Sequence, residues 1–157
     1  MKQGFTLIEI VLVVLVLAIV VGVAVPNIAK SLNTVELSQC AQDMLMTMRF
    51  AQARSRLEQK DYRLVFDDGF KAYHLERAVA DEPLDDQYNM EFIPLAGRWG
   101  RKQTVPSSMT IGSNKQLVQF YADGTIEPVR MELFNDKRKF ILSTMEQRGH
   151  VFLWEQT

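Results

Sequence analysis

The sequence predicts an α+β fold in which one long amino-terminal helix spans a membrane and continues into a small head of antiparallel β-sheet. Three patterns predict this fold: residues 5–25 are apolar almost throughout, residues 28–60 repeat apolar side chains at helical spacing, and residues 62–154 contain short alternating segments separated by turns. About 130 residues follow the apolar run, which is enough for one domain and too few for two.

The first segment is long enough to cross a bilayer. A helix from Phe5 to Val25 rises ~1.5 Å per residue and so covers roughly the ~30 Å of the hydrocarbon core. Its one charged residue is Glu9. A carboxylate inside lipid is costly, which makes Glu9 a functional-site hypothesis by default. Lys2 and Lys30 nearly balance across the segment, so flanking charge does not fix its orientation.

The residues from Gly4 to Glu9, Gly-Phe-Thr-Leu-Ile-Glu, followed by the apolar helix, resemble the amino-terminal signal of type IV pilins and type II secretion pseudopilins. The resemblance implies that a prepilin peptidase cleaves after Gly4 and that Phe5 then becomes N-methylated. It also implies that Glu9 serves filament assembly by pairing with the terminal amine of a neighbouring subunit. Two charges in hydrocarbon cost less together than apart, and the Phe5 amine lies about one helical turn from Glu9. Pairing within one subunit and pairing between staggered subunits both remain open.

The same resemblance implies an organisation for the whole chain. Residues 1–4 form the leader peptide, residues 5–28 the transmembrane half of the helix, and residues 29–157 a periplasmic pilin-like head that includes the amphipathic half of the helix. The resemblance further implies that the chain crosses the bacterial inner membrane once, with its amino terminus in the cytoplasm. The implied partners are the prepilin peptidase, other major and minor pseudopilins or pilins, the inner-membrane assembly platform and membrane lipid.

Two other interpretations of the apolar segment agree less well with its residues. An ordinary secretory signal peptide would be cleaved near the small residues 22–24, but Glu9 lies where such a signal is purely apolar and Pro26 follows the cut closely. A plain single-span anchor explains the length of the segment and leaves Glu9 unexplained. The sequence therefore favours the pilin-type signal.

Beyond the membrane segment the chain keeps a helical pattern to about Lys60, with two apolar seams on nearly opposite faces. The first seam contains Ile28, Leu32, Val35, Met46, Phe50, Ala53 and Leu57, and the second contains Leu37, Ala41, Met44, Met48 and Ala51, with Leu45 beside it. We expect one seam to pack on the sheet of the head. The other seam is covered either within the same head or by neighbouring subunits, and both alternatives stay open.

The remainder of the chain predicts β-structure. Strands are expected at residues 62–66, 71–76, 90–95, 117–121, 129–133, 140–142 and 151–154. A turn at Asp67-Asp68-Gly69 joins the first two strands, and residues 80–87 and 97–108 are expected to be loops. Pro128 predicts an edge position for the strand that follows it.

Three short stretches also resemble the carboxy-terminal pattern of the minor pseudopilin H and FimT/FimU-type pilins. These stretches are residues 120–124 (FYADG), 128–133 (PVRMEL) and 149–151 (GHV). The combined resemblance implies a non-enzymatic minor pseudopilin, assembled into the periplasmic pseudopilus of a type II protein secretion system. A minor pilin of a type IV pilus and a DNA-binding pilin of an uptake machine remain the alternatives.

No residue pattern indicates catalysis, a metal site or a cofactor. His74 and His150 lie far apart without metal-ligand spacing. Cys40 excludes an internal disulfide because it is the one cysteine, and we expect it to be a small packed hydrophobe. The acidic residues between Asp81 and Asp86, with Asn89, do not match an EF-hand loop, so a solvated loop is expected and calcium binding stays open.

One loop combines positive charge with an aromatic side chain that could stack on a base. Its candidate nucleic-acid contacts are Arg98, Trp99, Arg101 and Lys102. The chain as a whole has 18 Lys and Arg residues against 19 Asp and Glu residues, so no basic track supports this loop. The sequence therefore disfavours nucleic acid as a partner.

Overall fold

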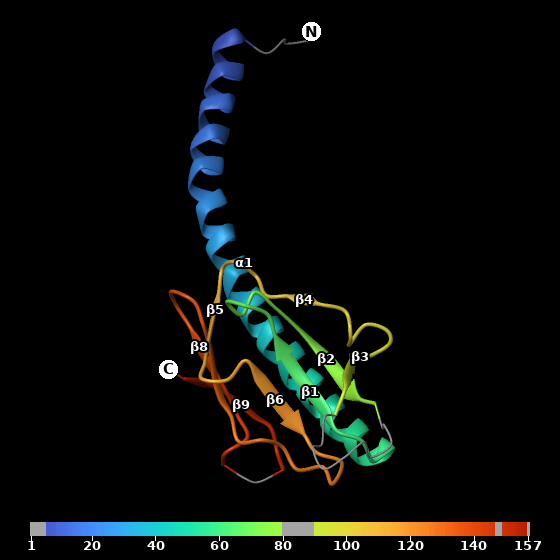
Figure 1. Ribbon diagram of the computed structural model, residues 1–157. Coiled ribbons are helices and arrows are strands. Elements are labelled where there is room, and N and C mark those ends of the chain that lie inside the picture. Colours follow the sequence, from blue (N-terminus) through green and yellow to red (C-terminus); the bar gives the residue numbers. More distant parts are fainter. Residues whose placement is uncertain (1–5, 80–89, 147–148, 157) are drawn as a thin grey trace.

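The longest element of the structure is one helix, α1 (Leu7–Glu58), which contains 52 residues. The computed structural model describes residues 6–79, 90–146 and 149–156, except for the side chains of residues 23–34. Figure 1 shows the amino-terminal part of α1 projecting away from the head, while its carboxy-terminal part packs against two β-sheets. The predicted α+β fold, a helix followed by an antiparallel β head, is confirmed.

The carboxy-terminal part of α1 buries only one of the two predicted seams. Met44 and Met48, in the second seam, have no exposed surface, and neither do Leu37, Ala41 and Ala51. In the first seam, by contrast, Met46 is 61% exposed and Leu57 is 76% exposed. Both sheets lie on the same side of the helix (Figure 1), so the alternative in which the head covers both faces is wrong. The side chains of Ile28 and Leu32 lie outside the described residues.

The first sheet follows the alternation that the sequence predicts. It contains β1 (Tyr62–Phe66), β2 (Ala72–Ala78), β3 (Phe92–Pro94), β4 (Gln103–Thr104) and β6 (Leu117–Phe120). Its order is β3-β2-β1-β6, with β4 also paired to β2, and every pairing is antiparallel. Alternate residues of β1 face the helix and are buried, which gives this sheet its share of the core.

The second sheet contains a strand that the sequence did not predict. It consists of β5 (Thr110–Ser113), β7 (Arg130–Phe134), β8 (Lys139–Ser143) and β9 (Phe152–Gln156), in the order β5-β7-β8-β9. The short strand β4, inside a predicted loop, was missed as well. The edge position predicted from Pro128 is wrong, because β7 lies between β5 and β8. Pro128 precedes the strand, so its missing N–H removes no hydrogen bond from the ladder.

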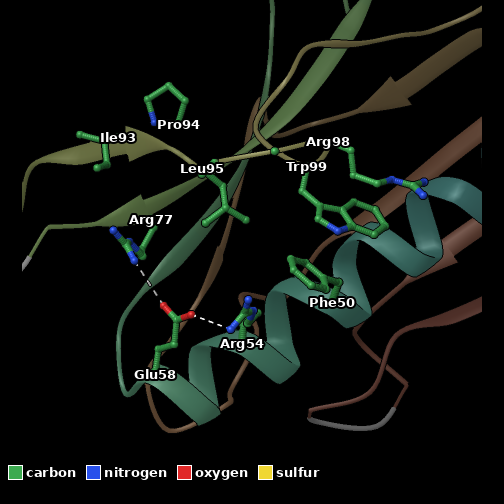
Figure 2. A pocket seen from close by; sticks show the side chains of 11 residues that line it. Phe50, Arg54, Glu58, Arg77, Ile93, Pro94, Leu95, Arg98 and Trp99 are labelled. Carbon is green, nitrogen blue, oxygen red and sulfur yellow. Dashed lines mark hydrogen bonds and ion pairs between the residues drawn. The ribbon is translucent and has the colours of Figure 1, made fainter.

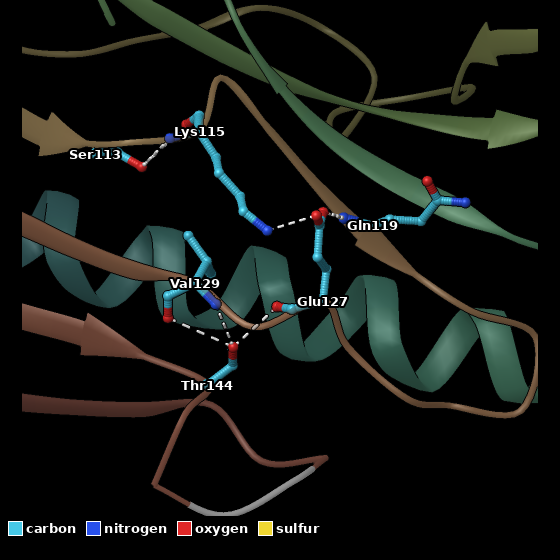
Figure 3. Close-up of polar contacts among 6 residues, drawn as sticks. All are labelled: Ser113, Lys115, Gln119, Glu127, Val129 and Thr144. Carbon is cyan, nitrogen blue, oxygen red and sulfur yellow. Dashed lines mark hydrogen bonds and ion pairs between the residues drawn. The ribbon is translucent and has the colours of Figure 1, made fainter.

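Polar contacts join the two sheets where the chain passes from β6 to β7 (Figure 3). The Thr144 hydroxyl donates to the carbonyl oxygen of Glu127 at 3.0 Å and accepts from the backbone N–H of Val129 at 2.9 Å. Lys115 Nζ pairs with the Glu127 carboxylate at 2.6 Å. Since Thr144 is only 4% exposed, these hydrogen bonds satisfy polar groups that burial would otherwise leave unpaired.

Two side chains on α1 fasten the helix to turns of the head. Gln52 Nε2 donates to the carbonyl oxygens of Gly124, at 2.9 Å, and of Gly149, at 2.6 Å. Arg56 donates to the same Gly124 oxygen at 3.3 Å. Gly124 has a φ of +84°, and a Cβ built on it would collide with the Arg56 side chain. A glycine is therefore required here both for its backbone conformation and for the close approach of Arg56.

We expect Gly124→Ala to destabilise the head more than Gly69→Ala. Both glycines have a positive φ, so each substitution should cost about 1–2 kcal/mol. Only Gly124→Ala also displaces Arg56 and disturbs hydrogen bonds to the turn, which adds about 1 kcal/mol. Urea unfolding of the full chain in detergent micelles measures the difference. In an Arg56→Ala background the two glycine substitutions should lower the free energy of unfolding equally. A remaining difference between them would contradict this explanation.

Candidate functional site

The predicted assembly residue, Glu9, lies in the first turn of α1. The helix begins after Thr6, whose carbonyl oxygen accepts from the backbone N–H of Glu9 at 3.1 Å. A negative side chain at this end of a helix interacts favourably with the unpaired N–H groups there. The Glu9 side chain is exposed and therefore accessible to a partner. Gly4 and Phe5 lie outside the described residues, so cleavage and methylation stay predictions.

The helix around Glu9 presents a continuous apolar surface. Every large apolar side chain from Leu7 to Val21 is between 48% and 81% exposed. Exposed apolar surfaces of this extent mark interaction sites for lipid or protein. Among the described residues, the structure contains no helix that is both long and apolar enough to cross a membrane.

A second apolar strip continues along the part of α1 that packs on the head. Its members, Val35, Met46, Ala53 and Leu57, are exposed on the side opposite the sheets. We call these four residues the outer face of α1. Phe50 belongs to the same predicted seam but is half-buried, because it packs against the core.

A cavity opens beside the outer face, at the carboxy-terminal end of α1 (Figure 2). Its volume is about 510 Å³. We call it the arginine pocket; it is lined by Phe50, Arg54, Glu58, Arg77, Ile93, Pro94, Leu95, Ala96, Gly97, Arg98 and Trp99. These residues come from α1, from β2 and β3 at one edge of the first sheet, and from the loop that follows β3.

Two of the three arginines in the arginine pocket lie beside one carboxylate. Arg54 lies 2.9 Å from Glu58 and Arg77 lies 3.5 Å from it, as the dashed lines in Figure 2 mark. The Tyr62 hydroxyl donates to Glu58 at 2.6 Å. That hydrogen bond, followed by the charges of Arg54 and Arg77, lowers the pKa of Glu58. Burial, then the contact with Glu58, raises the pKa of Tyr62 to about 12. Glu58 thus stays ionised and offsets one of the three guanidinium charges.

The predicted nucleic-acid contacts divide between the pocket and open solvent. The Trp99 ring stacks on Phe50 with 4.8 Å between ring centroids, and the Arg98 guanidinium lies 4.4 Å from the centre of the Trp99 ring. Trp99 is thus half-buried against the core, not an open platform for bases. Arg101 and Lys102 are exposed and do not line the pocket. The loop turns tightly at Gly100, where a Cβ would collide with the backbone of Leu95.

The remaining candidate residues that the structure describes make packing or polar contacts within the head. Cys40 packs in the core, and burial raises the pKa of its thiol to about 11, which keeps it protonated and inert. His74 lies 3.1 Å from Glu76 on β2. Within the described ranges, no three His, Cys, Asp or Glu side chains gather closely enough to hold a metal ion. The acidic residues 81–86 and Asn89 lie outside those ranges.

Sequence reasoning missed the arginine pocket. One part of the pocket could have been predicted from the sequence, because Arg54 and Glu58 have the i,i+4 spacing of a helical ion pair. Arg77 and the Phe50–Trp99 stack depend on contacts between distant parts of the chain, and no local pattern reports those.

Comparison with known proteins shows that this fold is similar to that of a minor pseudopilin and of a type IV minor pilin. The model of the prokaryotic N-terminal methylation motif matches residues 1–25. The minor pseudopilin EpsH from the type 2 secretion system of Vibrio cholerae superposes with a TM-score of 0.59 at 13% identity, over 76% of this chain and 97% of that chain. The type IV minor pilin FimU of Pseudomonas aeruginosa gives a TM-score of 0.54 at 14% identity, over 76% of this chain and 88% of that chain. No curated protein sequence matches. The chain thus has a pilin-like fold and carries a prepilin methylation motif.

Proposed function

We propose that this chain, pilin-like in fold and with a prepilin methylation motif, is a structural minor pseudopilin of a type II protein secretion system. A prepilin peptidase removes residues 1–4, Phe5 is methylated, and the subunit then enters a periplasmic pseudopilus. Its work is assembly and contact with other subunits, not catalysis. The observation that carries the proposal is the exposed apolar helix from Leu7 to Val21, which projects from a folded head.

The apolar surface of this helix must be covered both before and after assembly. In water its apolar surface would be costly, at roughly 25 cal/mol per Å² of exposed apolar area. Lipid covers residues 5–28 before assembly, with the amino terminus in the cytoplasm and the head in the periplasm. Helices of neighbouring subunits cover the same surface within the filament, and the outer face of α1 extends that contact toward the head. Partners are therefore the peptidase, the assembly platform of the inner membrane, and other pseudopilins.

A minor pilin of a type IV pilus is the second candidate. The likeness to FimU favours it, because the TM-scores of 0.59 and 0.53 for two EpsH structures and of 0.54 for FimU do not separate the two kinds of filament. The DNA-binding alternative has no comparable support, since Trp99 stacks on Phe50. It stays a prediction from the loop sequence. The chain can be expressed in one strain that lacks a minor pseudopilin and in another that lacks a minor pilin. Recovery of secretion without recovery of pilus formation would support the secretion system, and the reverse would support the type IV pilus.

Processing at the amino terminus is the first expected result. Co-expression with a prepilin peptidase should yield a chain that lacks residues 1–4 and carries one added methyl group at Phe5, as read by intact mass. Gly4→Leu should remain full-length, because the residue before the cut bond is changed while the helix is not. Cleavage near Ala24 would contradict the proposal and indicate a secretory signal peptide.

A further inference from the structure

Two short rows of exposed charges flank the outer face of α1. Glu36 and Asp43 lie seven positions apart, and so do Arg49 and Arg56, so each pair lies on one line along the helix. At ~100° per residue, the two acids lie about 70° to one side of the outer face and the two arginines about 70° to the other side. We call the first pair the acidic row and the second pair the basic row.

The acidic row has no cationic partner among the described residues. Glu36 accepts a hydrogen bond from the neutral Ser108 hydroxyl at 2.9 Å, which leaves its charge uncompensated. The Asp43 carboxylate makes no hydrogen bond or ion pair within the same ranges. Both side chains are exposed, so their charge is available to a partner.

The basic row has no ion pair in the part of the chain that the structure describes. Arg49 donates to the carbonyl oxygen of Val151 at 3.4 Å, and Arg56 donates to that of Gly124 at 3.3 Å. Asp123 lies near Arg56, but its carboxylate accepts hydrogen bonds within its own turn. A guanidinium group has five N–H donors, so both arginines keep donors that a carboxylate can bind.

The two rows are offset along the helix axis. Asp43 precedes Arg49 by six positions, which corresponds to an axial distance of ~9 Å. These two side chains do not meet on one helix, because only i,i+3 and i,i+4 neighbours face each other. A second, parallel helix shifted by this distance toward the carboxy-terminal end places its Asp43 level with Arg49 of the first. The same shift places its Glu36 level with Gln42, an exposed amide on the side of the basic row.

The pairing proposed for Glu9 requires a shift in the same direction and of similar size. The terminal amine at Phe5 precedes Glu9 by four positions, or ~6 Å at helical rise. The ~3 Å between the two shifts is less than the length of an arginine side chain. A parallel neighbour therefore brings its amine to Glu9 and its Asp43 to Arg49 together, so two distant parts of α1 indicate the same arrangement.

We propose that a second copy of this chain docks in parallel beside the outer face of α1, shifted by ~6–9 Å, with its acidic row against the basic row of the first copy. This contact rests on the proposed function, because anchoring in one membrane holds the copies parallel. The rows lie on opposite sides of one face, so the contact is head-to-tail and each copy leaves one row free for the next. Exposed ion pairs add little affinity, so the rows select orientation and shift while the apolar outer face supplies the attraction.

Disulfide cross-linking of full-length chains in membranes tests the shift. Two differently tagged chains, one with Glu36→Cys and one with Gln42→Cys, are produced together in a Cys40→Ala background, which leaves Asp43 and Arg49 in place. The mixed dimer should exceed each dimer of identical chains about fivefold, because cysteines cross-link only when their Cα atoms lie within roughly 7 Å. A mixed dimer no more abundant than the dimers of identical chains would overturn the proposal.

Charge reversal tests the rows themselves. Asp43→Arg or Arg49→Asp, introduced into both tagged chains, should each lower the mixed dimer about fivefold, because like charges then face each other. The double reversal should restore it, and no contact within one helix explains such a recovery. Arg101→Asp, on the exposed loop of the head, is the matched control and should change nothing. Single reversals without effect, or a double reversal without recovery, would overturn the proposal.

The same samples separate this contact from the filament assignment. Intact mass reports whether residues 1–4 are lost. Normal processing without the shifted dimer would overturn the contact and leave the filament assignment standing. Shifted dimers of a chain that is never processed at Gly4 would sink the filament assignment alone.

Discussion

Met48→Asp should abolish the folded head, whereas Met46→Asp, two positions earlier on α1, should leave it folded. Met48 has no exposed surface and packs between the helix and the sheets, while Met46 is 61% exposed on the outer face. An unpaired carboxylate at position 48 would cost several kcal/mol, and a domain of this size has about 5–15 kcal/mol of stability. Near-ultraviolet circular dichroism of the full chain in micelles distinguishes a packed core from a collapsed one.

The Met46 variant also carries information about assembly. If the outer face contacts a neighbouring subunit, Met46→Asp should be processed and folded normally and yet be depleted from filaments when it competes with the unchanged chain. Normal incorporation would show that this face is not a subunit contact. Unfolding by Met46→Asp would contradict the one-sided burial of the helix.

Glu9→Gln should remove the chain from filaments without affecting its processing. The substitution keeps the size of the side chain and deletes its charge. A terminal amine left without its carboxylate in an apolar environment costs about 3 kcal/mol or more, which corresponds to roughly a hundredfold loss at equilibrium. Competition for incorporation against the unchanged chain, scored by mass spectrometry of sheared filaments, measures this loss.

Two controls sharpen the Glu9 experiment. Glu9→Asp retains the charge on a shorter side chain and should recover part of the incorporation. The intact mass of Glu9→Gln should still show loss of residues 1–4, since position 9 is separate from the cut bond. Full incorporation of Glu9→Gln would exclude an ion pair between subunits as the role of this residue.

Local sequence patterns predicted much of the fold, and the errors have identifiable causes. The alternation of Tyr62, Leu64 and Phe66 predicted β1 to the residue, because period-two burial is a local property. Strand β5 was missed, since its residues include Gly112 and Ser113, which have low strand propensity. Its pairing with β7 determines its conformation, and that pairing joins distant parts of the chain. The error at Pro128 has the same origin, because position within a sheet is not a local property.

The candidate sites also differ in whether they depend on local sequence or on contacts between distant parts of the chain. Glu9 could be proposed from local sequence, because a carboxylate in an apolar run is anomalous whatever the rest of the chain does, and its role stays a prediction. The loop at residues 97–102 was recognised as basic and aromatic, but its sequence does not reveal that Trp99 packs on Phe50. The arginine pocket exists only after α1, β2 and the loop after β3 have come together, so composition and spacing could not reveal it.

The two hydrogen bonds of Gln52 have a consequence for the order of folding. Their acceptors, Gly124 and Gly149, lie 72 and 97 positions later in the chain, and β9 follows the second of them. During synthesis, the part of α1 that contacts the second sheet therefore stays uncovered until the chain as far as residue 156 has emerged. Contacts this distant in sequence make folding slow and leave apolar surface open to aggregation meanwhile. Under the proposed insertion of the first helix into the bilayer, such a chain would wait for β9 as a molecule tethered to the membrane.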